Sequence, residues 1–352
     1  MLEQILRTAL ARRASDIHLT VDSPPVLRLH GQLVRLEQDG RDLTLTPAVL
    51  EDMLQQLLTP AQLEQFRERG DLDLAYSLPD GARFRVNVYR QKGYPAVALR
   101  VINTSIPSFH DLGLPEVIAR LARLPRGLVL VTGPTGSGKS TTLAAMVDLI
   151  NREQAVHILT LEDPIEYVHR HKKAVVNQRE IGHDSLSFAA ALRAAMREDP
   201  DVILVGEMRD PETIAVALTA AETGHLVLAT LHTSSAAQTV DRIIDVFPPY
   251  QQQQIRVQLA NSLQGVVSQQ LIPRADRQGR VLALEIMVVT PAIRNLIREG
   301  KTYQIISQLQ TGGKFGMQTM DAHLRHLYQQ RLIGREEVLG RAQDPESLAK
   351  ML

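Results

Sequence analysis

The chain contains no cysteine and no tryptophan among its 352 residues. Without cysteine it can form neither disulfide bonds nor thiolate-ligated metal sites. It also lacks an apolar run of the roughly 18 residues that a transmembrane helix requires. The apolar residues near the N-terminus are interrupted by Arg7, Arg12 and Arg13, so they predict an amphipathic helix and not a signal peptide. We therefore expect a soluble, cytoplasmic protein.

An excess of charge of either sign is lacking as well. Lys and Arg together number 39, and so do Asp and Glu, which gives a net charge of zero. Because a dedicated nucleic-acid-binding protein usually carries a basic excess, this balance argues against a nucleic-acid partner. Apolar residues nevertheless make up 44% of the chain, which is enough to build a core, and the length suits two domains.

The first part of the chain, residues 1–102, has the pattern of a small α+β domain. Short segments in it alternate apolar and polar residues, which is the two-residue period of half-buried strands. These segments are 16–20, 26–30, 72–78, 83–89 and 96–102. Residues 1–13 and 47–69 instead repeat apolar residues with the period of a helix. Prolines and a glycine over 103–117 predict a linker after this domain.

The second part, residues 118–352, contains short and mostly apolar runs with helical patterns between them. The runs are 128–131, 156–161, 202–205 and 226–231, and the helical patterns are 140–151, 187–197 and 211–222. Continuous apolar strands that alternate with helices are typical of a parallel sheet covered by helices on both faces. Beyond residue 235 the pattern predicts mainly helices, with one strand near 281–289. We expect an α/β domain with a helical C-terminal part.

A phosphate-binding pattern stands between the first of these runs and the following helix. The pattern G-x-x-x-x-G-K-[ST] is matched at every position by Gly133, Pro134, Thr135, Gly136, Ser137, Gly138, Lys139 and Ser140. The glycines allow backbone N–H groups to point at phosphate oxygens, and the helix N-terminus adds its dipole. Lys139 should reach the β- and γ-phosphates and Ser140 should ligate Mg²⁺, with Thr141 next in the nucleotide-binding segment. The sequence therefore predicts a site for ATP and Mg²⁺.

Polar residues follow the other apolar runs at the same predicted edge of the sheet. Glu162, Asp163 and Glu166 follow one run, Glu207 follows the next, and His232 follows the one after. Because ligands of open parallel sheets bind beyond the carboxyl ends of the strands, we expect these side chains near the γ-phosphate. Phosphoryl transfer to water needs an oriented nucleophile and neutralised charge. We assign Glu166 to the water and Glu207 to the Mg²⁺ side.

Plainer interpretations stay open for these residues. A lone glutamate after a strand is often a neighbour of a helix cap or a surface charge. The usual Walker-B pattern ends in Asp-Glu, but Gly206 stands where the Asp is expected, so Glu207 would hold the metal alone or through water. His232 can sense the γ-phosphate. His225 precedes its strand of about 20 Å, so it should lie at the far edge, where a structural or interface role is favoured.

Arginines of the first domain are candidates for stabilising charge at an ATP site. Arg83, Arg85, Arg90 and Arg100 lie on predicted strands, and alternation puts Arg83 and Arg85 on one face. That face is either simply solvated or supplies an arginine finger, in its own subunit or in a neighbouring one. The spacing does not decide which arginine would act.

Together these motifs resemble those of the secretion-superfamily (GspE-like) P-loop ATPases and, within them, the type IV pilus retraction ATPases of the PilT family. The resemblance covers essentially the whole chain. It is carried by the segments 14–18, 133–140, 161–166, 199–210, 222–232 and 292–300. It implies that Glu166 is the catalytic glutamate, Glu207 the Walker-B glutamate, and His225 and His232 the two histidines of the His box. A Walker-B segment without its Asp is normal in this family.

The resemblance also implies an architecture and partners. A PAS-like N-terminal domain would precede a RecA-like ATPase domain, and nucleotide would bind where the two meet in a homohexameric ring. Arginines of the N-terminal domain would reach the phosphates. The ring would dock, as a peripheral protein, on the cytoplasmic side of an inner-membrane pilus platform protein, and a paralogous retraction ATPase is a further candidate partner. ATP hydrolysis would then drive pilus retraction and twitching motility.

Three other functions compete with retraction. Pilus-assembly and type II secretion ATPases are longer at the N-terminus and usually carry a four-cysteine zinc site, and neither feature is present in the sequence. A DNA translocase is disfavoured by the neutral net charge. A non-catalytic nucleotide-binding regulator is disfavoured because Lys139, Ser140, Glu166 and Glu207 are all present. We expect a retraction motor in which the linker 103–117 acts as a hinge.

Overall fold

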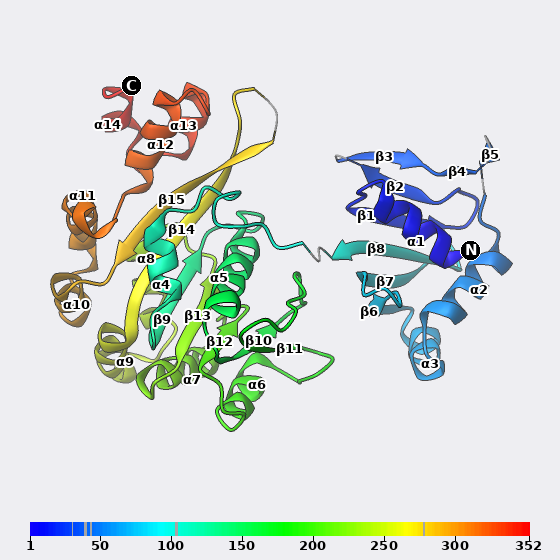
Figure 1. Ribbon diagram of the computed structural model, residues 1–352, viewed down its shortest axis with the longest axis horizontal. Helices are drawn as coiled ribbons and strands as arrows, with labels where there is room; N and C mark the ends of the chain where they lie inside the picture. The colour runs from blue at the N-terminus through cyan, green and yellow to red at the C-terminus, as the bar shows by residue number, and fades with distance from the viewer. Residues whose placement is uncertain (30, 39–40, 43, 103–104, 277–278) are drawn as a thin grey trace. The chain divides into compact units, whose positions relative to one another are not determined.

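The computed structural model describes residues 1–29, 31–38, 41–42, 44–102, 105–276 and 279–352. The chain divides into two compact units, Met1–Thr104 and Ser105–Leu352, each with its own sheet and core (Figure 1). Position 30 of the predicted strand 26–30 and positions 103–104 of the predicted linker lie outside the described residues.

The first unit is built on a six-stranded antiparallel sheet in the order β3-β2-β1-β8-β7-β6. Its strands are β1 (Asp16–Thr20), β2 (Val26–Leu29), β3 (Gln32–Arg35), β6 (Asp71–Ser77), β7 (Arg83–Gln91) and β8 (Tyr94–Ile102), with a small ribbon of β4 (Glu37–Gln38) and β5 (Arg41–Asp42). The helices are α1 (Leu2–Ala11), α2 (Pro47–Leu57) and α3 (Pro60–Arg69). Leu6, Ile17 and Phe84 are fully buried between them. The predicted α+β pattern is therefore present.

Residues 47–69 are helical, as predicted, but they form two helices, α2 and α3. The side chain of Thr59 accepts a hydrogen bond from the Gln62 backbone, and the Gln62 side chain accepts one from the Thr59 backbone. This capping box satisfies two N–H groups that a helix start leaves unpaired, and Pro60 suits the first turn. The chain therefore begins a new helix at this point.

The second unit contains a seven-stranded sheet in the order β11-β10-β12-β13-β9-β14-β15. Its strands are β9 (Gly127–Thr132), β10 (His157–Glu162), β11 (Val175–Glu180), β12 (Val202–Val205), β13 (Leu226–Leu231), β14 (Leu263–Pro273) and β15 (Arg280–Val288). All neighbours are parallel except β14 and β15, which form an antiparallel hairpin at one edge. The α/β class is confirmed, but β11 and β14 were not predicted.

Helices cover both faces of this sheet (Figure 1). They are α4 (Glu116–Ala122), α5 (Lys139–Glu153), α6 (Phe188–Ala195), α7 (Pro211–Glu222), α8 (Ala236–Asp245), α9 (Pro249–Ser262), α10 (Pro291–Arg298), α11 (Ile305–Thr311), α12 (Met320–Gln329), α13 (Arg335–Arg341) and α14 (Pro345–Ala349). Leu128 and Leu130 of β9 pack under α6, α7 and α8, whereas Val129 and Val131 pack under α4 and α5. The continuous apolar strands thus serve two cores.

The segment that the sequence predicted as a linker belongs largely to the second unit. Leu114 and Val117 are buried against the sheet, and Phe109 and Leu112 pack beside them. These apolar side chains lie among and just after the prolines and glycine that prompted the prediction. The division between the two units accordingly precedes this segment, at Ser105.

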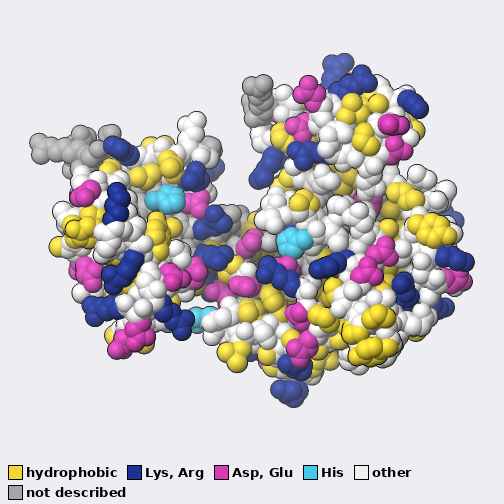
Figure 2. Space-filling view, turned by 180° about the vertical axis from the view of Figure 1, so that it is seen from behind, with side chains coloured by type: hydrophobic (Ala, Val, Ile, Leu, Met, Phe, Trp, Pro, Cys, Tyr) yellow, Lys and Arg dark blue, Asp and Glu magenta, His cyan; other side chains and the backbone are white. Residues whose placement is uncertain are grey.

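The surface of each unit mixes charges of both signs. Acidic and basic side chains are interspersed on the face shown in Figure 2, in agreement with a net charge of zero. Within the part of the chain that the structure describes, no helix combines the length and apolar character needed to cross a bilayer.

Candidate functional site

A cavity of about 400 Å³ lies in the second unit, where β9, β10, β12 and β13 end. Parallel strands bring their carboxyl ends to one edge of a sheet, which is why segments far apart in sequence meet there. Among the lining residues are Gly136, Gly138, Lys139, Ser140, Thr141, Glu162, Asp163, Glu166, Tyr167, His169, Gly206, Glu207, Arg209, Thr230, His232 and Arg280. The site therefore gathers most of the residues predicted from the sequence.

The phosphate-binding segment forms one wall of the cavity. It connects β9, which ends at Thr132, with α5, which begins at Lys139. Gly133 has a φ of 142°, and a Cβ at this position would stand 2.3 Å from the backbone oxygen of Gln269. Lys139 donates hydrogen bonds from Nζ to the carbonyl oxygens of Gly133 (2.8 Å) and Pro134 (3.1 Å). The loop thus wraps around the lysine and directs it to the cavity wall.

Strand β14 packs against this loop and holds it by a hydrogen bond. The buried side chain of Gln269 donates from Nε2 to the carbonyl oxygen of Ser137 at 2.7 Å. Next to it, Thr132 and Ser268 share a buried hydroxyl–hydroxyl hydrogen bond of 2.7 Å. The Oε1 atom of Gln269 and the Oγ atom of Ser137 are buried without a hydrogen-bond partner among the described residues. Sequence reasoning missed Gln269 because β14 was not predicted.

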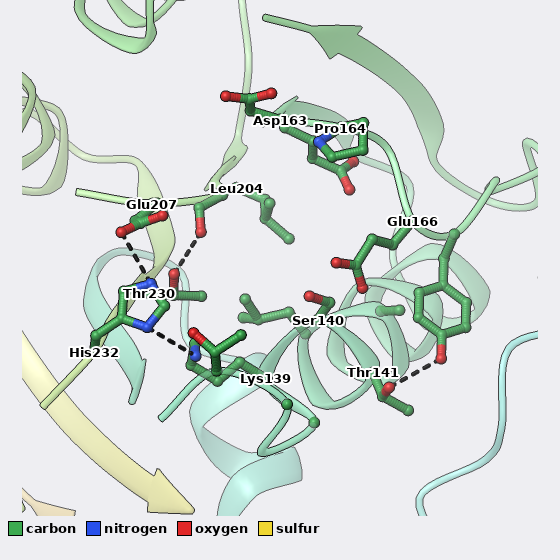
Figure 3. A pocket seen from close by; sticks show the side chains of 18 of the residues that line it. Lys139, Ser140, Thr141, Asp163, Pro164, Glu166, Leu204, Glu207, Thr230 and His232 are labelled. Atoms are coloured by element: carbon green, nitrogen blue, oxygen red, sulfur yellow. Dashed lines mark hydrogen bonds and ion pairs between the residues drawn. The ribbon is translucent and has the colours of Figure 1, made fainter. Parts of the chain in front are cut away.

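His232 connects the phosphate-binding lysine to a carboxylate. Its Nδ1 atom lies 3.5 Å from Lys139 Nζ, and its Nε2 atom lies 3.0 Å from Glu207 Oε1 (Figure 3). A neutral imidazole satisfies both contacts at once when Nδ1 accepts from the lysine and Nε2–H donates to Glu207. The three side chains come from three elements, the start of α5 and the segments after β12 and β13.

The electrostatics of this group stabilise Glu207 as a carboxylate. Burial lowers the pKa of Lys139, while the charges of Glu207 and Glu166 act to raise it. Burial acts to raise the pKa of Glu207, but the Arg209 hydrogen bond and the charges of Arg209 and Lys139 lower it overall. Arg209 Nε contacts Glu207 Oε1 at 2.6 Å. Glu207 is therefore an ionised, oxygen-only donor suited to a hard cation.

Glu166 stands on the opposite wall, in the loop after β10. Its carboxylate points into the cavity, whereas Asp163 points away from it (Figure 3). The neighbouring Tyr167 shares a hydrogen bond of 2.9 Å between its hydroxyl and that of Thr141 on α5. Glu162, the last residue of β10, is half-buried, and desolvation raises its pKa. Among Glu162, Asp163 and Glu166, Glu166 is thus the one placed to act in the cavity.

Gly206 occupies the position where a Walker-B aspartate was expected, and the structure gives a reason. A Cβ on Gly206 would stand 3.0 Å from the Leu161 oxygen and 3.3 Å from Glu162 Cα. The backbone N–H of Gly206 donates to the same Leu161 oxygen at 2.7 Å. The ends of β10 and β12 therefore approach so closely that a side chain at residue 206 would push them apart by a few tenths of an ångström, and Glu207 is the acidic residue of this segment in the cavity.

Other candidate residues lie away from the cavity. His225 stands at the start of β13, beside Gly127, and its Nδ1 lies 2.9 Å from the Ala220 oxygen. It is at the far edge of the sheet, as the strand direction predicted. Arg83, Arg85 and Arg100 belong to the first unit, where Arg85 and Arg100 face each other across β7 and β8.

Within the first unit, Arg100 has a partner. Its Nε atom lies 3.0 Å from Asp16 Oδ1. Burial acts to raise the pKa of Asp16, but hydrogen bonds from Ser15 and Arg100 lower it overall. The pair is mostly exposed on the arginine side, so it holds the guanidinium at the sheet surface without burying it.

The arrangement fits a nucleotide with its metal ion. Backbone N–H groups at the start of α5 and the ammonium of Lys139 suit phosphate oxygens. The hydroxyl of Ser140 and the carboxylate of Glu207 are hard oxygen ligands, as Mg²⁺ prefers. Sequence reasoning missed Tyr167 and Arg280 in the cavity wall. Tyr167 directly follows Glu166 and was within reach of a local argument, whereas Arg280 comes from the distant β15.

Comparisons with known proteins agree with this site. The model of the type II/IV secretion system protein family matches residues 1–339. The chain is 49% identical to the type IV pilus retraction ATPase PilT of Pseudomonas aeruginosa, over 98% of this chain and 99% of that protein. It is 48% identical to a twitching motility protein of Neisseria gonorrhoeae, over 98% and 91%. A crystal structure of the pilus retraction motor PilT with bound ADP superposes with a TM-score of 0.92 at 48% identity, covering 100% of this chain and 99% of that one. The chain belongs to the type II/IV secretion system protein family.

Proposed function

We propose that this chain is a subunit of a motor that hydrolyses ATP to power the retraction of type IV pili. The observation that carries the proposal is one cavity in which the Lys139 loop, Glu166 and Glu207 converge. The 49% sequence identity to the PilT retraction ATPase, over nearly the full length of the chain, supports the biological role. The alternatives of a pilus-assembly or type II secretion ATPase gain no support from a particular feature of the site.

Each residue has a proposed task in hydrolysis. Mg²⁺–ATP would supply the phosphoryl group and a cation that neutralises its charge. The start of α5 and Lys139 bind the phosphates, and Ser140 and Glu207 provide oxygen ligands on the metal side. Glu166 holds the attacking water and accepts its proton. His232, which bridges Lys139 and Glu207, reports whether the lysine is engaged with phosphate.

The assembly and partners are part of the proposal. Six copies would form a ring that rests on an inner-membrane pilus platform protein from the cytoplasmic side, and a paralogous retraction ATPase is a candidate helper. Arg83, Arg85 and Arg100 are the candidates for a contribution to a neighbour's phosphates. Movement of the unit Met1–Thr104 against the unit Ser105–Leu352 would convert ATP state into mechanical work. Nucleic acid has no part in this function.

ATPase assays on the purified full-length protein test the chemistry. We expect Lys139→Ala to lose both nucleotide binding and hydrolysis. We expect Glu166→Gln to bind a fluorescent ADP derivative like the unmodified protein while kcat falls about 10²–10⁴-fold, as for loss of a general base. Glu336→Gln, at an exposed glutamate of α13 outside the cavity, is the matched control. Turnover by Glu166→Gln within twofold of the control would refute the assigned mechanism.

An experiment in cells tests whether the motor retracts pili or assembles them. Surface pili are counted after deletion of the gene and after complementation with Lys139→Ala. Accumulated pili that no longer retract would support retraction. Cells without pili would show that the protein builds fibres, and the retraction proposal would fail while the ATPase assignment stands.

A further inference from the structure

The loop that carries Glu166 is held by a strand that contributes nothing to the cavity itself. This strand, β11, is the edge strand of the sheet and pairs in parallel with β10, with Thr160 opposite Gln178 and Glu162 opposite Glu180. Residues 163–169, between β10 and the return to β11, carry the catalytic candidate. A loop of this kind leaves several backbone groups outside the sheet ladder, and each of them needs a hydrogen-bond partner.

Gln178 supplies two of these backbone hydrogen bonds, and a third to a side chain, from a single amide. Its Nε2 atom donates to the carbonyl oxygen of Tyr167 at 2.8 Å and to Glu162 Oε1 at 3.1 Å. Its Oε1 atom accepts from the backbone N–H of His169 at 2.7 Å. Two N–H hydrogens serve two acceptors and one oxygen serves one donor. The amide orientation is therefore determined by its surroundings.

These contacts fix the backbone immediately after the proposed catalytic glutamate. Tyr167 is the next residue after Glu166, and its carbonyl is clamped by Gln178 while its hydroxyl is tied to Thr141 on α5. Tyr167 is thus fixed relative to both β11 and the nucleotide-binding helix, through its carbonyl and its hydroxyl. The side chain of Glu166 enters the cavity from a backbone that has little freedom to turn (Figure 3).

We propose that Gln178 is a positioning residue for ATP hydrolysis, which orients Glu166 through the backbone of residues 167–169. The inference rests on the proposed function, because it needs Glu166 to act on the attacking water. Catalysis depends on such alignment steeply, since a displacement of about 1 Å can cost roughly 100-fold in rate. Nucleotide affinity, by contrast, depends on the loop before α5, which Gln178 does not touch.

No other type of residue reproduces these contacts. Methionine matches glutamine in length but provides none of the three hydrogen bonds. Glutamate keeps an acceptor for the His169 N–H but loses both donors and brings a second carboxylate to Glu162. Asn177, the neighbouring residue of β11, faces the exposed side and contacts His157 Nε2 at 3.0 Å. It offers a matched control in which an amide is removed from the same strand.

The test compares Gln178→Met, Gln178→Glu and Asn177→Leu in the full-length protein. For each, kcat, the dissociation constant of a fluorescent ADP derivative and the thermal midpoint are measured. We expect kcat of both Gln178 variants to fall at least tenfold, while the dissociation constant stays within twofold of the unmodified protein. Asn177→Leu should retain kcat within twofold. Deuterium uptake in residues 163–170 should rise in both Gln178 variants and stay unchanged in Asn177→Leu.

Several outcomes would overturn the inference. A kcat within twofold of normal in a folded Gln178→Met protein would show that other contacts hold the loop. Equal losses in kcat and in ADP affinity, with a lowered thermal midpoint, would reduce Gln178 to a structural role. If Gln178→Met does not fold, Gln178→Glu decides by the same criteria, and failure of both to fold would also assign Gln178 to the fold alone. If Glu166→Gln is itself active, the proposed function fails first, so the two failures are distinguishable.

Discussion

Replacement of Gln269 by methionine should weaken nucleotide binding through the phosphate-binding loop while it leaves the stability of the fold nearly unchanged. The change removes the 2.7 Å hydrogen bond from Nε2 to the Ser137 oxygen, which leaves a buried carbonyl without a donor. It also removes Oε1, which is buried without a partner among the described residues. An unpaired buried polar group costs about 1–3 kcal/mol, so the cost of leaving the Ser137 carbonyl unpaired and the gain from removing the unpaired Oε1 are of similar size. We expect the thermal midpoint to change little.

Nucleotide affinity should nevertheless fall. The lost hydrogen bond contributes about 1 kcal/mol to the loop conformation that binds phosphate. A free-energy difference of 1.4 kcal/mol corresponds to a factor of ten, so about 1 kcal/mol predicts roughly fivefold weaker binding. The assay is titration of a fluorescent ADP derivative, together with a thermal melt of the protein alone.

Gln264→Met is the control for this prediction. Gln264 lies near the start of the same strand, where its side chain packs against Gly127. We expect it to leave ADP affinity unchanged. An unchanged dissociation constant in Gln269→Met, or an equal loss in Gln264→Met, would refute the idea that Gln269 specifically sets the loop.

Three further predictions concern stability. Gly206→Asp, which restores the usual Walker-B sequence, should destabilise the protein by about 1–3 kcal/mol because a Cβ meets the Leu161 oxygen at 3.0 Å, and a thermal melt measures this. Glu285→Leu should lower the thermal midpoint more than Glu285→Gln, because the buried carboxylate accepts from the Ala236 backbone at 2.7 Å, at the start of α8. Burial lowers the pKa of His169 from 6.5 to about 4, so the folded protein favours the neutral imidazole. The contribution of His169 to the free energy of unfolding is complete above pH 6.5. It is lost as the pH falls toward 4, because the unfolded chain binds the proton first. The melting temperature of His169→Gln should therefore depend less on pH in this window, and equal dependence in both proteins would contradict the assignment.

The sequence alone determined the features that depend on local pattern. The glycines and the lysine of the phosphate-binding loop are read within eight residues, because the loop's geometry is local. Continuous apolar runs predicted the central strands, since each strand faces two cores. The rule that ligands bind beyond strand ends then brought Glu166, Glu207 and His232 to one edge without any tertiary information.

Some local features of the sequence did not enter the predictions. The break between α2 and α3 is marked by Thr59, Pro60 and Gln62, a capping box that the helical period of residues 47–69 concealed. The sequence pattern did not predict strand β14 for a different reason. This strand carries buried Ser268 and Gln269, and such polar residues look like those of an exposed segment until their partners are known.

Only the tertiary structure decided how the catalytic candidates are held. Gln178 stands 12 residues after Glu166, and Gln269 stands 132 residues after Ser137, so no periodicity connects them. The tight contact that a side chain at residue 206 would make likewise arises from the close approach of β10. Motifs specify which groups carry chemistry, because those groups meet the ligand directly. The residues that orient them act through hydrogen bonds across separate strands, and such contacts exist only once the sheet has formed.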